Sequence, residues 1–166
     1  MWNAEGRWQG HAQIGLSAKG RAQAADVARE LAADPPDAVY SSDLARARET
    51  AEIIAAKLGL PVTLDARLRE IDVGEWAGLT RDEVAARFPG ASRWRDGETH
   101  EAMGARILTR LHELAAEHQG ERVLVVTHGG PIRVVRVEGG VVEELEISNC
   151  HVQRVRFEAG KITRVD

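Results

Sequence analysis

The sequence predicts an α/β protein: a three-layer sandwich in which helices flank a mostly parallel central sheet. Two observations support this prediction. Short apolar runs, which are typical of buried strands, alternate along the chain with longer segments whose apolar residues recur at helical spacing. In addition, residues 123–126 are four consecutive aliphatic residues (Val-Leu-Val-Val), a pattern that favours a fully buried strand.

The composition indicates a single globular domain, which we expect to span residues 1–166. The chain carries 22 Lys and Arg against 26 Asp and Glu, a net charge of -4, which excludes a strongly basic nucleic-acid-binding protein. Cys150 is the only cysteine, so no internal disulfide can form. No apolar run approaches the ~20 residues of a membrane span, and the polar first 14 residues do not resemble a secretory signal. We therefore expect a cytoplasmic protein without a membrane partner.

The first half of the chain predicts two helices and two strands. Ser17 is a suitable N-cap for a helix that reaches about Ala33, where Asp34-Pro35-Pro36-Asp37 stops it. A short apolar strand follows at residues 38–41. Ser42 or Asp43 then caps a second helix that ends at Gly59, and residues 61–64 form another strand.

The second half predicts two further helices, a buried strand and a set of antiparallel strands. Thr80 and Glu83 form a capping box, and Thr99 begins the longest helix, which Gly120 ends. The apolar run at 123–126 is the buried strand. The C-terminal third alternates apolar and polar residues, which predicts strands or hairpins. These runs are Val134–Val137, Val142–Ile147, Val152–Phe157 and Ile162–Val165, with turns at Gly139-Gly140 and Ala159-Gly160.

In a parallel sheet, ligands bind outside the carboxyl ends of the strands, so the residues that follow each predicted strand are the first candidates. His128 follows the buried strand and precedes Gly129, Gly130 and Pro131. The glycines allow close approach of the backbone to a ligand, and a helix starting there would offer free N–H groups to an anion. The alternative is a turn histidine bonded to the backbone.

Two more candidates follow the other predicted strands. Arg46 lies in the first turn of a helix, where the dipole disfavours a cation, so it is suited to face an anion; the alternative is a solvated arginine. Glu70 lies in a glycine-punctuated loop with Asp72, Glu75 and Trp76. A carboxylic acid beside a cationic pocket can serve as a general acid; the alternative is a surface loop in which the tryptophan only packs.

Taken together, these motifs resemble the histidine phosphatase superfamily, the phosphoglycerate mutase-like proteins, over nearly the whole chain. The resemblance depends on several blocks in a fixed order, which is more specific than any one block. The blocks are Asn3 with Gly6-Arg7 and Gln9-Gly10; Leu16-Ser17 with Gly20; Ser41-Ser42-Asp43-Leu44 with Arg46-Ala47; Leu68-Arg69-Glu70 with Gly74-Glu75-Trp76; Gly97-Glu98-Thr99; and Thr127-His128-Gly129-Gly130.

The resemblance implies phosphoryl chemistry through a phosphohistidine, with no metal and no cofactor. It assigns Arg46 to the phosphate pocket, Glu70 to proton donation, and His128 to the second histidine, with Gly129 as a neighbouring backbone donor. Imidazole is a good nucleophile near neutral pH, and positioned cations stabilise the transition state. Substrate or phosphate contacts are also implied for Asn3, Gln9, Gly10, Glu98 and Thr99.

One departure from the family is large. The family's signature is an Arg-His-Gly triplet at the end of a first strand, and this triplet does not occur in the 166 residues. We therefore expect a domain without its first strand, without its nucleophile, and inactive or nearly so on its own. The unpaired edge left in the sheet would favour self-association.

These observations lead to one function and two alternatives. The first is hydrolysis of small phosphomonoesters by the complete protein, with a small phosphorylated metabolite as ligand and no nucleic-acid partner. The first alternative is a non-catalytic relative that binds a phosphate ester or a protein. The second is mutase-type phosphoryl transfer. The sequence leaves the substrate and the oligomeric state open.

Overall fold

A computed structural model describes residues 2, 5–141, 147–158 and 160–164. Its centre is a three-stranded parallel sheet, β1 (Ala38–Ser41), β2 (Val62–Leu64) and β3 (Val123–Val126), in the order β2-β1-β3. The register places Ser41 opposite both Leu64 and Val126, so the three strands end at the same edge.

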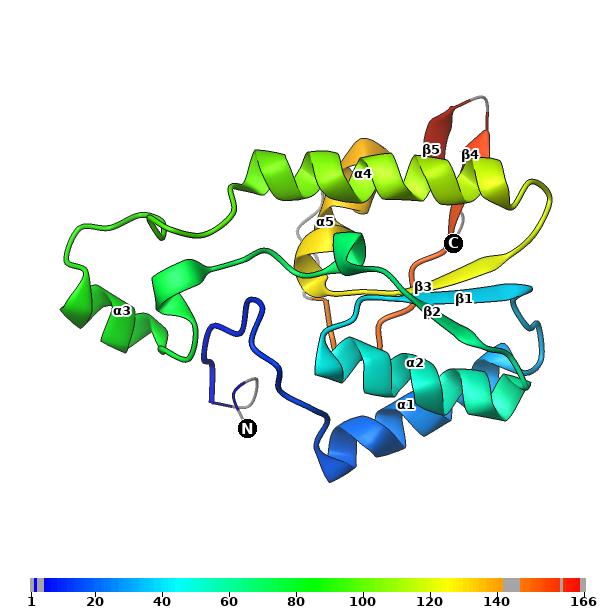
Figure 1. Cartoon of the computed structure of the whole chain (residues 1–166), viewed down its shortest axis with the longest axis horizontal. Coiled ribbons are helices and arrows are strands. Elements are labelled where there is room, and N and C mark those ends of the chain that lie inside the picture. The colour runs from blue at the N-terminus through cyan, green and yellow to red at the C-terminus, as the bar shows by residue number, and fades with distance from the viewer. Residues whose placement is uncertain (1, 3–4, 142–146, 159, 165–166) are drawn as a thin grey trace.

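Helices cover both faces of this sheet (Figure 1). Helices α1 (Ala18–Leu31) and α2 (Ala45–Leu58) pack against each other on one side, and α4 (His100–Glu117) crosses the other side. Helix α5 (Gly129–Glu138) packs against α4. The predicted α/β sandwich with a parallel sheet is therefore confirmed. Among the described residues, no helix is both long enough and apolar enough to span a membrane.

Local capping signals set three of the helix starts as predicted, at Ser17, Thr80 and Thr99. The Ser17 hydroxyl accepts a hydrogen bond from the N–H of Gly20 (2.9 Å). Thr80 and Glu83 form the reciprocal capping box of α3 (Arg81–Arg87). Each cap satisfies N–H groups that the first turn of a helix leaves unpaired.

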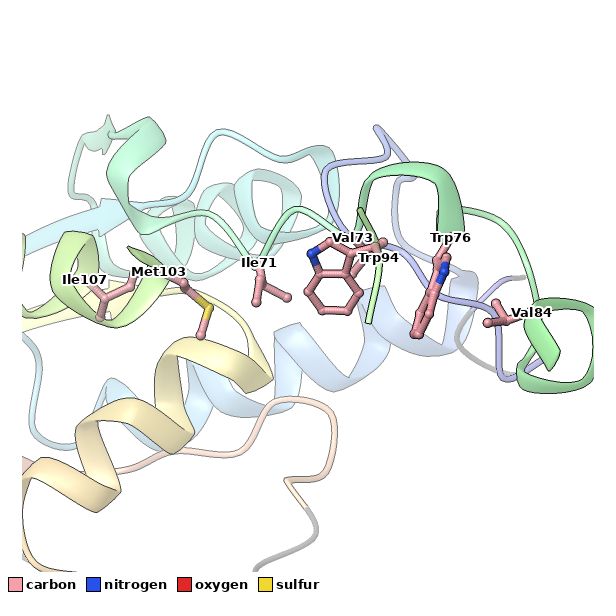
Figure 2. Close-up of a cluster of buried hydrophobic side chains, with 7 residues drawn as sticks. All are labelled: Ile71, Val73, Trp76, Val84, Trp94, Met103 and Ile107. Carbon is pink, nitrogen blue, oxygen red and sulfur yellow. The ribbon is translucent and has the colours of Figure 1, made fainter. Parts of the chain in front are cut away.

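Residues 70–99 extend away from the sheet and carry α3 at their far end (Figure 1). Two short 3-10 helices belong to this part of the chain: η1 (Ala66–Leu68) lies at the base of the extension, and η2 (Gly74–Trp76) lies farther out, close to α3 (Figure 1). Figure 2 shows how it is held: a row of buried apolar side chains continues from α4 to α3. The row consists of Ile71, Val73, Trp76, Val84, Trp94, Met103 and Ile107.

The N-terminal segment runs beside this extension. The N–H of Trp8 donates to the carbonyl of Leu79 (2.9 Å), and the N–H of Gly78 donates to the carbonyl of Trp8 (2.8 Å). These two bonds fix the approach of residues 10–12 to the carboxyl edge of the sheet.

Three local predictions were wrong. Val134–Val137 belongs to α5 instead of a strand, because Pro131 lies in the first turn of a helix whose Val134 and Val135 pack against the core cluster. The N-cap of α2 is Leu44, without a side-chain cap, instead of Ser42 or Asp43. The two predicted caps make other contacts, described below.

The third wrong prediction concerns β3, whose four residues are only partly buried. It pairs with β1 on one edge, and no other strand of the described residues pairs with it. The predicted C-terminal hairpin is confirmed in part: β4 (Val155–Glu158) pairs antiparallel with β5 (Lys161–Arg164). The predicted strand at Val142–Ile147 lies almost wholly outside the described residues.

Candidate functional site

The sheet topology indicates where a ligand would bind at the carboxyl edge of the sheet. The chain leaves β1 to form β2 on one side and later returns to form β3 on the other, so the crevice expected at such a switch point would lie beyond the carboxyl ends of β1 and β3. Ser42 follows β1 and His128 follows β3. Their side chains meet across this crevice, with His128 Nε2 2.9 Å from Ser42 Oγ.

His128 is the deepest ionisable group at this place. Its side chain is buried, and it serves as the N-cap residue of α5. Burial holds the pKa of His128 well below its ordinary value, and the nearby positive charge of Arg46 lowers it further. His128 is therefore neutral at pH 7 when the site is empty.

Arg46 projects from the first turn of α2 toward the same crevice. Its guanidinium donates to the carbonyls of Gly10 (2.9 Å) and Ala12 (3.2 Å). Burial lowers the pKa of Arg46, and the neighbouring Glu70 carboxylate partly offsets this effect. Arginine still remains charged, and three of its five N–H groups are free of these two bonds. The side chain is therefore a fixed positive charge that still has N–H donors available for a ligand.

The Glu70 carboxylate is held by backbone donors. Its Oε1 accepts from the N–H of Ile71 (2.9 Å), and its Oε2 accepts from the N–H of Gly130 (3.2 Å). Gly130 has no room for a side chain, because a Cβ there would lie 2.2 Å from Glu70 Oε1. The second glycine after His128 therefore brings the helix N-terminus against the carboxylate.

Two further side chains, those of Thr127 and Arg106, hold the loop that carries Glu70 in place. The Thr127 hydroxyl donates to the carbonyl of Leu68 (2.7 Å), which ties the end of β3 to this loop. From α4, Arg106 donates to the carbonyls of Arg67 (2.7 Å) and Arg69 (3.1 Å). The same guanidinium holds Glu98 through both carboxylate oxygens, at 2.9 and 2.6 Å.

The remaining edge of the site is polar. His11 Nε2 lies 2.8 Å from the carbonyl oxygen of Glu70, and His11 Nδ1 lies 3.7 Å from an oxygen of Asp72. Arg69 forms a two-bond ion pair with Asp43, and this pair lowers the pKa of the Asp43 carboxyl. Within the described residues, no three His, Cys, Asp or Glu side chains gather closely enough to hold a metal ion.

A guanidinium, two imidazoles and one carboxylate gathered at one place suit the binding of a tetrahedral oxyanion and the transfer of a proton to one of its oxygens. Comparison with known proteins agrees with this chemistry: the histidine phosphatase superfamily (branch 1) matches residues 1–165. The chain belongs to the histidine phosphatase superfamily.

Several members of the superfamily are close in sequence or structure. Phosphoglycerate mutase-like protein 4 of Arabidopsis thaliana is 43% identical over 179 residues, covering 98% of this chain and 77% of that protein. A glucosyl-3-phosphoglycerate phosphatase of Mycolicibacterium vanbaalenii is 39% identical over 147 residues, covering 79% of this chain and 65% of the relative. The solved structure of Bacillus stearothermophilus YhfR superposes with a TM-score of 0.89 at 30% identity, covering 98% of this chain and 89% of that one.

The structure brings the three main candidates of this superfamily member together and separates some of the others. Arg46, Glu70 and His128 surround one crevice, with Gly129 at its rim as the first residue of α5. Gly10 reaches the crevice through its carbonyl. The other predicted contacts are placed as follows: Gln9 bonds Ala12 through its carbonyl, Glu98 binds Arg106, Thr99 caps α4, and Asn3 lies outside the described residues.

Sequence reasoning gave no site role to three side chains that line or support the crevice: Ser42, His11 and Arg106. Ser42 had a signal, because it directly follows the first strand of the sheet, but it was interpreted as a helix cap. His11 follows the Gln9-Gly10 pair of the family pattern. Arg106 had no signal, because its partners at 67, 69 and 98 meet it only in the fold.

Proposed function

We propose that the chain forms the phosphate-binding and proton-donating part of a phosphomonoesterase that acts on small phosphorylated metabolites through a phosphohistidine, without a metal. The observation that carries this proposal is the convergence of Arg46, His128 and Glu70 on one crevice beyond β1 and β3. The superfamily supports the reaction class, and the geometry supports the division of roles.

The phosphoryl group would sit between Arg46 and His128. Free N–H groups of Arg46 donate to its oxygens, and the His128 ring donates another hydrogen bond. A dianion beside a buried neutral imidazole favours the protonated ring. His128 therefore takes up a proton when phosphate binds, which places a second positive charge against the oxygens where negative charge accumulates during transfer.

Two balanced steps follow. In the first, an imidazole nitrogen attacks phosphorus, the P–O ester bond breaks, and the leaving oxygen takes a proton from the Glu70 carboxyl. In the second, water attacks phosphorus, the P–N bond breaks, and Glu70 takes the proton of the water, which releases orthophosphate. The attacking imidazole belongs to the family's Arg-His-Gly triplet, which does not occur in these 166 residues, and no residue here is assigned that role.

The relatives support a small, oxygen-rich ester as the ligand. One is named as a glucosyl-3-phosphoglycerate phosphatase and another as phosphoglycerate mutase-like. We therefore propose a phosphate ester of a short oxygenated carbon chain for this protein as well.

The proposal is tested by phosphate binding to the 166-residue chain. We expect orthophosphate to bind at millimolar concentration by ³¹P NMR titration, and Arg46→Lys to weaken this binding by about tenfold, because lysine keeps the charge and loses the fork of donors. Arg29→Lys, on the exposed last turn of α1, is the matched control and should bind like the wild type. Unchanged affinity in Arg46→Lys would contradict the proposal.

A second candidate function is phosphate-ester binding without catalysis, for which the charges of Arg46 and His128 would suffice. The coding DNA upstream of Met1 decides between the two. In-frame codons for an apolar strand ending in Arg-His-Gly support the hydrolase, and their absence supports the binding protein. Mutase activity, the third alternative, would appear as transfer of phosphate between two positions of one acceptor in place of release to water.

A further inference from the structure

Arg133 lies beside the candidate site and takes part in none of the contacts described there. It belongs to α5, one turn after Gly129, and its Nη1 lies 3.3 Å from the position that a Cβ of Gly129 would occupy. Long side chains in a helix lean toward its N-terminus. The guanidinium therefore extends back over the residue that adjoins His128.

The other arginines around the crevice are engaged by the protein. Arg46 donates to two carbonyls, Arg69 is paired with Asp43, and Arg106 is paired with Glu98. Arg133 is exposed, and it makes no hydrogen bond or ion pair with any residue that the structure describes. None of these residues occupies its five N–H donors, which are therefore available to a ligand.

The position of Glu70 shows which part of a ligand Arg133 would meet. In the proposed mechanism Glu70 protonates the leaving oxygen, so the leaving group lies on the side of its carboxylate. That carboxylate touches the N–H of Gly130. Arg133 follows Gly130 by three residues in α5 and so lies on the same face of the helix. It borders the leaving group, whereas Arg46 and His128 border the phosphoryl group.

We infer that Arg133 is a specificity-determining residue that binds an oxyanion group, a carboxylate or a second phosphate, carried by the leaving group of the substrate. A planar guanidinium matches either group with two parallel hydrogen bonds. This inference rests on the proposed function and narrows it to phosphomonoesters with a second negative group close to the ester.

The test compares four probes on the 166-residue chain: orthophosphate, glycerol 3-phosphate, 3-phosphoglycerate and glycerol 1,3-bisphosphate. Glycerol 3-phosphate and 3-phosphoglycerate differ in that the latter carries a carboxylate. We expect Arg133→Gln to weaken, by about tenfold, the binding of at least one of the two esters that carry a second anionic group, 3-phosphoglycerate and glycerol 1,3-bisphosphate. Binding of orthophosphate and glycerol 3-phosphate should change by less than about twofold. The ester that loses affinity shows whether Arg133 binds a carboxylate or a second phosphate.

Two further variants control for charge and folding. Arg133→Lys should recover part of the lost affinity, because it restores the charge without the fork. Arg29→Gln removes an equal charge from α1 and should leave all four affinities unchanged. If Arg133→Gln weakens all four probes equally, or weakens neither 3-phosphoglycerate nor glycerol 1,3-bisphosphate, this inference is wrong and the proposed function still stands. If the wild-type chain binds none of the four, both the proposed function and this inference fail.

Discussion

Replacement of Gly130 by alanine should destabilise the protein by about 1–2 kcal/mol, because the Glu70 side chain has to move away from the new methyl group. The new Cβ would lie 2.2 Å from Glu70 Oε1 and 3.1 Å from Met103 Sδ. The Glu70 carboxylate must then leave its place, which also breaks its hydrogen bond from the N–H of residue 130. Urea denaturation of the wild type and the variant measures the loss.

The helix that packs against α5 offers a matched control of opposite sign. Gly104 lies inside α4, and a Cβ there would meet Val134 at 3.8 Å, an ordinary van der Waals contact. Gly104→Ala should therefore raise the free energy of unfolding by about 0.5–1 kcal/mol, because alanine is the better helix former.

A double-mutant cycle separates the Glu70 contact from general crowding. In a Glu70→Ala background, Gly130→Ala should cost clearly less than in the wild type, since the clashing oxygen is gone and only the flexible Met103 side chain has to shift. The same cost in both backgrounds would show that the close fit between Glu70 and α5 is not the reason for this glycine.

Elements with complete local signals could be predicted from the sequence. Thr80 and Glu83 form the predicted capping box, and Ser17 caps α1, because these bonds join residues three apart. Prediction failed where a distant contact decided the structure. Alternation at Val134–Val137 was typical of a strand, but packing on α4 and the core cluster made it a helix.

In the candidate site, too, residues with a local sequence signal could be predicted, and residues placed by distant contacts could not. Arg46, Glu70 and His128 were found because each follows a strand whose carboxyl end could be inferred, and the order of the family blocks agreed. Ser42 was misinterpreted as a cap, because its bond to His128 joins residues 86 apart. Arg106 could not be predicted from the sequence. It holds three backbone carbonyls and one carboxylate, and these groups come close to it only in the folded structure.

The tryptophans illustrate how burial decides between two interpretations. A tryptophan near a charged site can either line an apolar wall for the leaving group or pack in the core, and Trp76 and Trp94 show which of the two applies. Both are buried, and each packs against Trp8 with ring centroids 5.6 and 6.1 Å away. They fill the core of the extension (Figure 2). Charged groups at the rim, and not these rings, are therefore expected to select the substrate.

The second large effect is a loss of stability in mild acid caused by His128. Its folded-state pKa is well below its ordinary value, because the ring is buried and because the positive charge of Arg46 lies nearby. The unfolded chain binds a proton at this residue near pH 6.5, whereas the folded chain does not. The free energy of unfolding therefore falls as the pH drops below about 6.5, and it continues to fall until the pH reaches the folded-state pKa, with a limiting slope of about 1.4 kcal/mol per pH unit.

Urea denaturation at pH 7.5, 6.0 and 5.0 measures this contribution, and His128→Gln is the control because glutamine cannot titrate and can still bond to Ser42 Oγ. The difference in unfolding free energy between the two proteins should shrink, or reverse, by about 1–2 kcal/mol between pH 7.5 and 5.0. The carboxylates whose pKa values are lowered, such as Asp43 and Asp65, lose their contributions only at lower pH. Added orthophosphate should flatten the slope in the wild type alone, because a bound dianion favours the protonated ring. Parallel pH curves for the two proteins would mean that His128 titrates normally, and the buried imidazole could not then be the proton-accepting charge partner of the phosphoryl group.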